Sequence, residues 1–423
     1  MKMDYVQLKN QLRREVQERL DYGRDFTDEE VEEVIDEIML QSQKLILCPV
    51  NIRLRIKKEV FDSLRRLDIL QEYVDDNEVT EIMINGKDHI FVEKKGKLQR
   101  LERGFDTVEK LQDVIQQIVA GCNRVVNEAS PIVDARLANG SRVNIVMNPV
   151  ALNGPIVTIR RFPDKPITIK QLIEWESITE EAAVFLEKLV QAKYNIFVSG
   201  GTGSGKTTFL NVLSDFIPAD ERVITVEDSA ELQLLNIENL VSLETRNSNV
   251  EGCEEITIRD LIKASLRMRP DRIIVGEVRG AEAFDMMQCL NTGHDGSMST
   301  GHANSAQDML SRLENMILMG MELPLEAIRQ QIASGIDIIV HLGRMRDKSR
   351  RVLEIAEVIG YKNGRILMNS LYCFEEQEEG EIHAENKKDS QDKVRGMLQK
   401  AGELMHIGKL KSSGLQSVSM EDE

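Results

Sequence analysis

A glycine-rich segment that ends in lysine and threonine has the spacing that phosphate binding requires. Residues 200–207 read GGTGSGKT and match the pattern GxxxxGK followed by Ser or Thr. Glycines allow backbone amides to wrap around phosphate oxygens, and the N-terminus of a following helix adds a partial positive charge. The segment therefore predicts a phosphate-binding loop made of Gly200, Gly201, Thr202, Gly203, Ser204, Gly205, Lys206, Thr207 and Thr208.

Two side chains at the end of this loop have separate tasks in nucleotide chemistry. Lys206 can reach the β- and γ-phosphates of a bound nucleotide, and the Thr207 hydroxyl can ligate Mg²⁺. The loop follows the apolar run NIFVSG and precedes the helical pattern TTFLNVLSDFI. This strand–loop–helix context favours a P-loop nucleoside triphosphatase that uses ATP and Mg²⁺ over a glycine-rich turn without function.

Two further apolar runs end in carboxylates. RIIVGE predicts a Walker B strand in which Glu277 serves the metal together with Thr207, although Gly276 stands where an aspartate is common. In ITVEDSAEL, Glu227 or Glu231 is expected to orient or deprotonate the attacking water. The alternative for each run is an exposed acid past a strand end that has no catalytic role.

The stretch GHDGSMSTGH contains two of the six histidines, His294 and His302. A zinc site needs three or four ligands, and Cys289 is the nearest third candidate, but the spacing is unusual for zinc. A second alternative is that either histidine is a buried core residue. The third is a catalytic pair that senses the phosphates of the nucleotide.

Changes in hydrophobic periodicity divide the chain into regions. The first has helical spacing and a capping box from Thr27 to Glu30, and the second mixes alternating strands with Asn-Gly turns. Two prolines in Phe162–Pro166 mark a linker. Helices that alternate with buried strand runs then predict an α/β fold. The predicted regions are an N-terminal helical region at 1–72, a small α+β domain at 73–162, a linker at 163–174, a RecA-like P-loop ATPase domain at 175–373, and a charged C-terminal tail, disordered or weakly helical, at 374–423.

The composition is typical of a globular cytoplasmic protein. The chain is 41% hydrophobic and 30% charged, no apolar run approaches the roughly 20 residues of a membrane span, and the N-terminus has no apolar signal core. Five scattered cysteines, an odd number, indicate reduced thiols. A net charge of −17 disfavours a protein that coats nucleic acid.

Four segments taken in order resemble the type II/type IV secretion ATPase superfamily: GGTGSGKTT, ITVEDSAEL, RMRPDRIIVGEVRGAEAF and NTGHDGSMSTGHANSA. DARLANGSRVNIVMNPVA and GPIVTIRRF make the chain similar to the CpaF-type ATPase of tight-adherence (Flp) pilus assembly. The resemblance implies a homo-hexameric ATPase at the inner face of the cytoplasmic membrane, where it works with inner-membrane platform proteins. It also implies that glycine is normal at position 276 and that both histidines approach the phosphates, His302 by contact and His294 by positioning the loop.

Arginines near the end of the α+β domain are candidates for completing the site. Phosphoryl transfer gains from positive charge at the γ-phosphate, often from another domain or subunit. Arg136, Arg142, Arg160 and Arg161 cluster at the end of this domain, and the resemblance implies that residues from this region close over ATP. The candidates are Arg142, Arg160 and Arg161, with Arg267 and Arg279 as further ones. The alternative is that they make only surface ion pairs.

A ring-shaped nucleic-acid translocase or helicase is the alternative function, because P-loop rings also perform that task. The charge of −17 and the lack of a Lys/Arg-rich loop with interleaved aromatic residues disfavour it, so no nucleic-acid partner is expected. A nucleotide-gated scaffold without catalysis would need a broken site, yet Lys206, Thr207, Glu227 and Glu277 are present.

Overall fold

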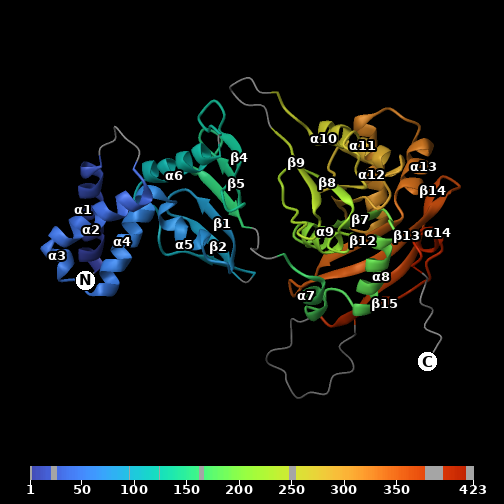
Figure 1. Ribbon diagram of the computed structural model, residues 1–423, viewed down its shortest axis with the longest axis horizontal. Helices are drawn as coiled ribbons and strands as arrows, with labels where there is room; N and C mark the ends of the chain where they lie inside the picture. Colours follow the sequence, from blue (N-terminus) through green and yellow to red (C-terminus); the bar gives the residue numbers. More distant parts are fainter. Residues whose placement is uncertain are drawn as a thin grey trace, which may run out of the picture. The chain divides into compact units, whose positions relative to one another are not determined.

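The chain forms two compact units, Met1–Asp164 and Lys165–Glu423 (Figure 1). The computed structural model describes residues 2–20, 26–94, 96–122, 124–161, 166–246, 254–376 and 394–415. The predicted linker core at 162–165 lies outside these residues.

The N-terminal part of unit 1 is a helical bundle with its own apolar core. Its helices are α1 (Lys2–Arg19), α2 (Asp28–Gln41), α3 (Gln43–Ile46) and α4 (Val50–Arg65). Leu12, Ile35 and Ile56, from three different helices, meet in this core and are at most 1% exposed. The predicted capping box at the start of α2 is confirmed, because the Thr27 side chain accepts from Glu30 N and Thr27 N donates to the Glu30 carboxylate.

The second part of unit 1 is an antiparallel sheet of six strands in the order β3-β2-β1-β6-β5-β4. Alternating apolar residues of β1, β2, β5 and β6 pack with helix α6 in one core, which confirms the predicted α+β character. The elements are η1 (Asp68–Leu70), α5 (Gln71–Val74), β1 (Val79–Asn85), β2 (Ile90–Lys94), β3 (Lys97–Arg100), α6 (Val108–Gly121), β4 (Ile132–Arg136), β5 (Arg142–Val146) and β6 (Ile156–Arg160).

The predicted boundary at residue 72 is wrong by several residues. Leu70 and Val74, on η1 and α5, are buried in the core of the sheet rather than in the helical bundle. The two parts are also tied together, since Lys110 Nζ on α6 donates to Ser63 O at 2.7 Å. The structure therefore has one unit with two cores where the sequence predicts two domains.

Unit 2 is a nine-stranded sheet in the order β15-β14-β13-β12-β7-β11-β10-β8-β9. Strands β12, β7, β11, β10, β8 and β9 are parallel, and β13 to β15 extend the sheet with antiparallel pairs. Helices α8 and α9 pack in one apolar cluster and α10 to α13 in another, so both faces of the sheet are covered (Figure 1). This arrangement confirms the predicted α/β class.

The elements of unit 2 follow the predicted alternation of helix and strand up to β12. They are α7 (Ile169–Glu174), α8 (Glu180–Gln191), β7 (Ile196–Gly200), α9 (Lys206–Ser214), β8 (Arg222–Glu227), β9 (Asn239–Glu244), α10 (Ile258–Ser265), β10 (Arg272–Val275), α11 (Glu282–Leu290), β11 (Met298–His302), α12 (Ala306–Gly320), α13 (Leu325–Gly335), β12 (Ile338–Arg344), β13 (Arg350–Lys362), β14 (Arg365–Glu376), β15 (Gly396–Lys400) and α14 (Gly408–Ser412).

Two predicted boundaries of the ATPase domain are wrong. Helix α7 falls in the predicted linker, yet Leu172 is buried in the core of unit 2. The predicted tail contains β15 and α14, whose Leu398 and Leu410 are buried in the same core. Both segments are short and polar, but each places a few apolar side chains on the sheet. The rest of the predicted tail, 377–393 and 416–423, lies outside the described residues.

Candidate nucleotide site

The parallel strands of unit 2 bring the predicted site residues to one edge of the sheet. Strands β7, β11, β10 and β8 are consecutive neighbours, and ligands of such sheets bind beyond the carboxyl ends of the strands. At that edge β7 leads into the phosphate loop, β8 ends at Glu227 and β11 ends at His302. Glu277 follows β10 by two residues.

The phosphate loop has the backbone geometry that its glycines permit. Gly203 and Gly205 have φ values of 72° and 93°, which side chains other than glycine rarely adopt. At Gly200, a Cβ atom would stand 2.5 Å from Leu342 O. Gly205 precedes α9, which begins at Lys206, so the loop amides and the helix N-terminus face the same site.

Lys206 is the buried cation of the site. The residue is 8% exposed, and its Nζ donates to Gly200 O at 3.2 Å and to Gly201 O at 3.1 Å. His302 Nδ1 lies 3.2 Å from the same nitrogen. Burial lowers the pKa of Lys206, and the charge of Glu277 opposes this shift. The loop carbonyls therefore hold the ammonium group where phosphate oxygens can accept from it.

His302 connects Lys206 with Glu277. Its Nε2 lies 2.8 Å from Glu277 Oε1, while its Nδ1 faces the lysine. Burial and the nearby Lys206 lower the pKa of His302. A neutral ring protonated on Nε2, as these partners imply, accepts from Lys206 and faces the carboxylate with its N–H. The structure thus places the predicted sensor histidine in contact with the predicted phosphate-binding lysine and with Glu277.

Glu277 fits the role of an Mg²⁺ ligand. Its Oε2 accepts from Arg279 Nε at 2.9 Å and Nη2 at 2.6 Å. Its Oε1 is buried and, despite the short distance to His302, accepts no hydrogen bond of good geometry. Mg²⁺ prefers such hard oxygen donors, and Thr207, at the start of α9, supplies the second candidate. These two residues would hold the metal.

Glu227, one of the two candidates for the catalytic base, is buried at the end of β8. It is 3% exposed and accepts from Glu231 N at 2.9 Å and Leu232 N at 3.1 Å. Burial raises the pKa of Glu227 to about 7. A Cβ atom at position 276 would stand 2.8 Å from Glu227 Cγ, which explains the glycine in the Walker B strand. In this structure Glu227 orders the loop that carries Glu231.

His294 lies at the opposite end of β11 from His302. The strand has five residues, and its length of about 16 Å separates the two side chains. The prediction that both histidines approach the phosphates is wrong for His294 within its own unit. The zinc alternative with Cys289 is wrong for the same reason.

The three candidate arginines lie together at one end of the unit 1 sheet. Arg142 on β5 and Arg160 on β6 are register partners, and Arg161 follows directly. Arg161 Nη2 donates to Asn77 Oδ1 at 3.0 Å, and its Nη1 donates to Asp76 O. Arg161 therefore anchors the start of β1, whereas the Arg160 side chain is exposed.

Sequence reasoning missed His341, a buried histidine next to the phosphate loop. Its Nδ1 lies 2.9 Å from Ser199 Oγ, directly before the loop, and its ring also bonds to the backbone of Asn304, two residues after His302. Burial lowers the pKa of His341. The signal was present, since a histidine inside the apolar run IDIIVHL is unusual in a buried strand.

The fold and the site define a P-loop ATPase built on a mostly parallel, doubly covered sheet. Residues 64–416 match the family described as type II/IV secretion system protein. The chain belongs to this family, which confirms the resemblance at the level of the superfamily.

Two curated relatives and one solved structure illustrate the match. A putative conjugal transfer protein of Mycobacterium tuberculosis is 34% identical over 321 residues, 73% of this chain and 90% of that protein. The type IV secretion system protein PtlH of Bordetella pertussis is 31% identical over 315 residues, 68% of this chain and 93% of that protein. The X-ray structure of the ATPase DotB of Yersinia pseudotuberculosis has the same fold, with a TM-score of 0.50 and 19% identity over 69% of this chain and 77% of that chain.

No helix in the described part of the chain combines the length and the apolar character that a membrane span needs.

Proposed function

We propose that the chain is a hexameric motor that hydrolyses ATP to drive pilus assembly of the tight-adherence (Flp) type, or type II/IV secretion. It acts at the cytoplasmic face of the inner membrane with platform proteins of the apparatus. The main structural support for motor activity is the contact series from Lys206 through His302 to Glu277. The family match and relatives named for type IV secretion and conjugal transfer support the wider assignment.

In the proposed cycle, binding of ATP changes the partners of this series. Lys206 then donates to the γ-phosphate instead of to the loop carbonyls. His302 donates to phosphate instead of facing Glu277. Thr207 and Glu277 would hold Mg²⁺ in this cycle, and the ion would supply positive charge beside the phosphates. Loss of the γ-phosphate returns His302 to Glu277, so the segment after β11 senses the state of the nucleotide.

We expect Arg160 to complete the site of a neighbouring subunit. Arg160→Ala should cut turnover while preserving ATP binding, because only the charge at the γ-phosphate is lost. Mixing equal amounts of Arg160→Ala and Lys206→Ala subunits should restore roughly a quarter of wild-type activity, since random rings bring an intact lysine next to an intact arginine at that frequency. Steady-state ATPase assays beside light scattering measure both quantities. A mixture no more active than its parts would contradict a shared site.

A complementation experiment tests the cellular role. In a host from which the gene is deleted, the wild-type chain should restore surface pili or secretion, and Lys206→Ala at equal abundance should not. Electron microscopy and secreted-protein analysis give the readout. A defect in DNA transfer alone, with normal pili and secretion, would contradict the proposal and favour the conjugal role for which the mycobacterial relative is named.

A further inference from the structure

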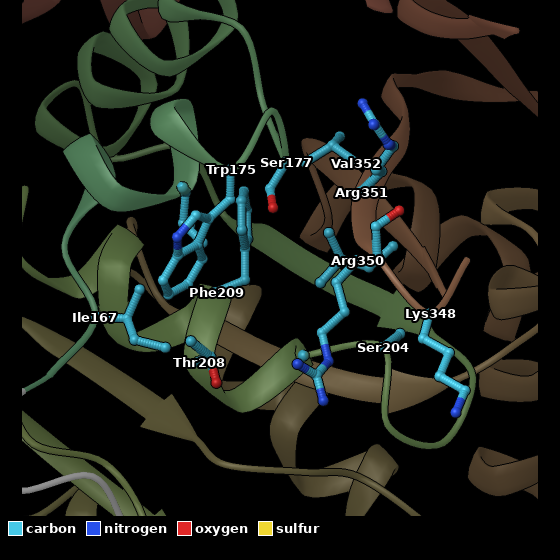
Figure 2. Close-up of a pocket in the computed structure, with 14 residues that line it drawn as sticks. Ile167, Trp175, Ser177, Ser204, Thr208, Phe209, Lys348, Arg350, Arg351 and Val352 are labelled. Carbon is cyan, nitrogen blue, oxygen red and sulfur yellow. The ribbon is translucent and has the colours of Figure 1, made fainter. Parts of the chain in front are cut away.

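Two separate cavities flank the phosphate loop. Gly201, Thr202 and His302 line one of about 510 Å³, together with Asp308 and Arg312. Ser204, Gly205 and Thr208 line the other, of about 230 Å³, which lies beside helix α7 and the β12–β13 hairpin (Figure 2). The first cavity therefore has a polar lining, whereas helix α7 and the β12–β13 hairpin enclose the second.

The position of the catalytic groups fixes the direction of a bound nucleotide. His302 contacts both Lys206 and Glu277, and these three residues define the γ-phosphate end. The nucleoside must leave the loop away from His302, because one phosphate chain cannot fold back on itself. The second cavity begins at Ser204 and Thr208, so it lies where the nucleoside emerges.

One wall of this second cavity is apolar and aromatic. Figure 2 shows the rings of Trp175 and Phe209 next to each other, with Ile167 and Thr208 at the same end of the cavity and Arg350 at the other. Trp175 is 54% exposed, an unusual state for a large ring on a concave surface. Planar bases bind such surfaces by stacking.

Local structure holds the backbone of Trp175 in place. Trp175 caps α7 and its backbone N–H donates to Gln171 O at 2.9 Å, and the next residue, Glu176, has a positive φ of 56°. The buried Arg351 donates to Glu176 O at 3.0 Å. A backbone fixed in this way limits the positions that the ring can take, so less conformational freedom is lost on stacking.

We propose that Trp175 is the stacking platform for the nucleobase of ATP, in the cavity that it shares with Phe209 and Ile167. Arg350, whose Nε donates to Gly203 O at 2.9 Å, closes the same cavity beside the loop. The inference rests on the nucleotide site described above and adds to it the residue that recognises the base.

Trp175 is the only tryptophan of the chain, so its fluorescence reports directly on this cavity. ATP and ADP should quench its emission saturably. Inorganic tripolyphosphate should compete for the loop without quenching, because it has no base. Trp175→Ala should weaken ATP binding about tenfold or more, whereas Trp175→Phe should retain most of the affinity and Leu367→Ala, at an exposed apolar residue on β14, should change nothing.

The outcomes separate the base site from the phosphate site. Calorimetric ATP binding without quenching, together with unchanged affinity in Trp175→Ala, would overturn the stacking proposal and leave the phosphate loop in place. Equal loss of ATP and tripolyphosphate binding in Trp175→Ala would also overturn it, because the effect would then be structural. If neither ligand binds the wild-type chain, the nucleotide site itself fails.

Discussion

Replacing Lys206 with alanine is expected to reduce ATP hydrolysis by at least about 100-fold, the scale on which loss of one preorganised charge-stabilising donor acts. The Nζ of Lys206 lies within 3.2 Å of two loop carbonyls and of His302, so it is already placed for the β- and γ-phosphates. Its removal leaves the charge that develops during phosphoryl transfer without its fixed cation. Steady-state turnover at saturating ATP measures the loss.

The same substitution should not unfold unit 2. The ammonium group of Lys206 donates to neutral backbone carbonyls and not to a carboxylate. Its replacement by alanine therefore breaks no direct ion pair. Lys362→Ala, at an exposed lysine at the end of β13, is the matched control and should keep full activity. A Lys206→Ala protein with normal melting and turnover within a few-fold of wild type would contradict the P-loop assignment.

The phosphate loop could be predicted because all its residues are contiguous in the sequence. Glu277 and His302 could be predicted one by one, because each lies at or just beyond the end of a run that becomes a strand. Their contact could not be predicted, since it depends on the strand order β7-β11-β10 that only the fold reveals. The error on His294 has the same origin, because eight residues of sequence include a whole strand.

Trp175 was missed for a different reason. The preceding helix α7 is six residues long and follows a proline pair, so its pattern is typical of a linker. The strand β15 and helix α14 were missed likewise, because a few buried apolar residues, Val394, Leu398 and Leu410, stand in a charged sequence. Periodicity identifies long elements, and these short ones are fixed by tertiary packing.

Glu277→Gln should separate binding from hydrolysis. The amide keeps the size of the side chain but removes the negative charge that Mg²⁺ requires, so turnover should fall by about 100-fold. ATP affinity should remain close to wild type, because the loop amides and Lys206 are untouched. The Mg²⁺ concentration for half-maximal activity should rise, which a purely structural role of Glu277 would not cause. Turnover and equilibrium nucleotide binding at several Mg²⁺ concentrations test these expectations.

The hydrogen bonds of Glu277 determine whether the fold of this variant should stay intact. Its Oε2 also receives two hydrogen bonds from Arg279, and glutamine retains an oxygen that can accept them. The local loop should therefore persist, as melting of Glu277→Gln beside Glu322→Gln, an exposed control on the same unit, would verify. If Glu277→Gln binds ATP no better than Lys206→Ala does, Glu277 contributes to nucleotide binding itself, and its assignment as the metal ligand that acts in hydrolysis is wrong.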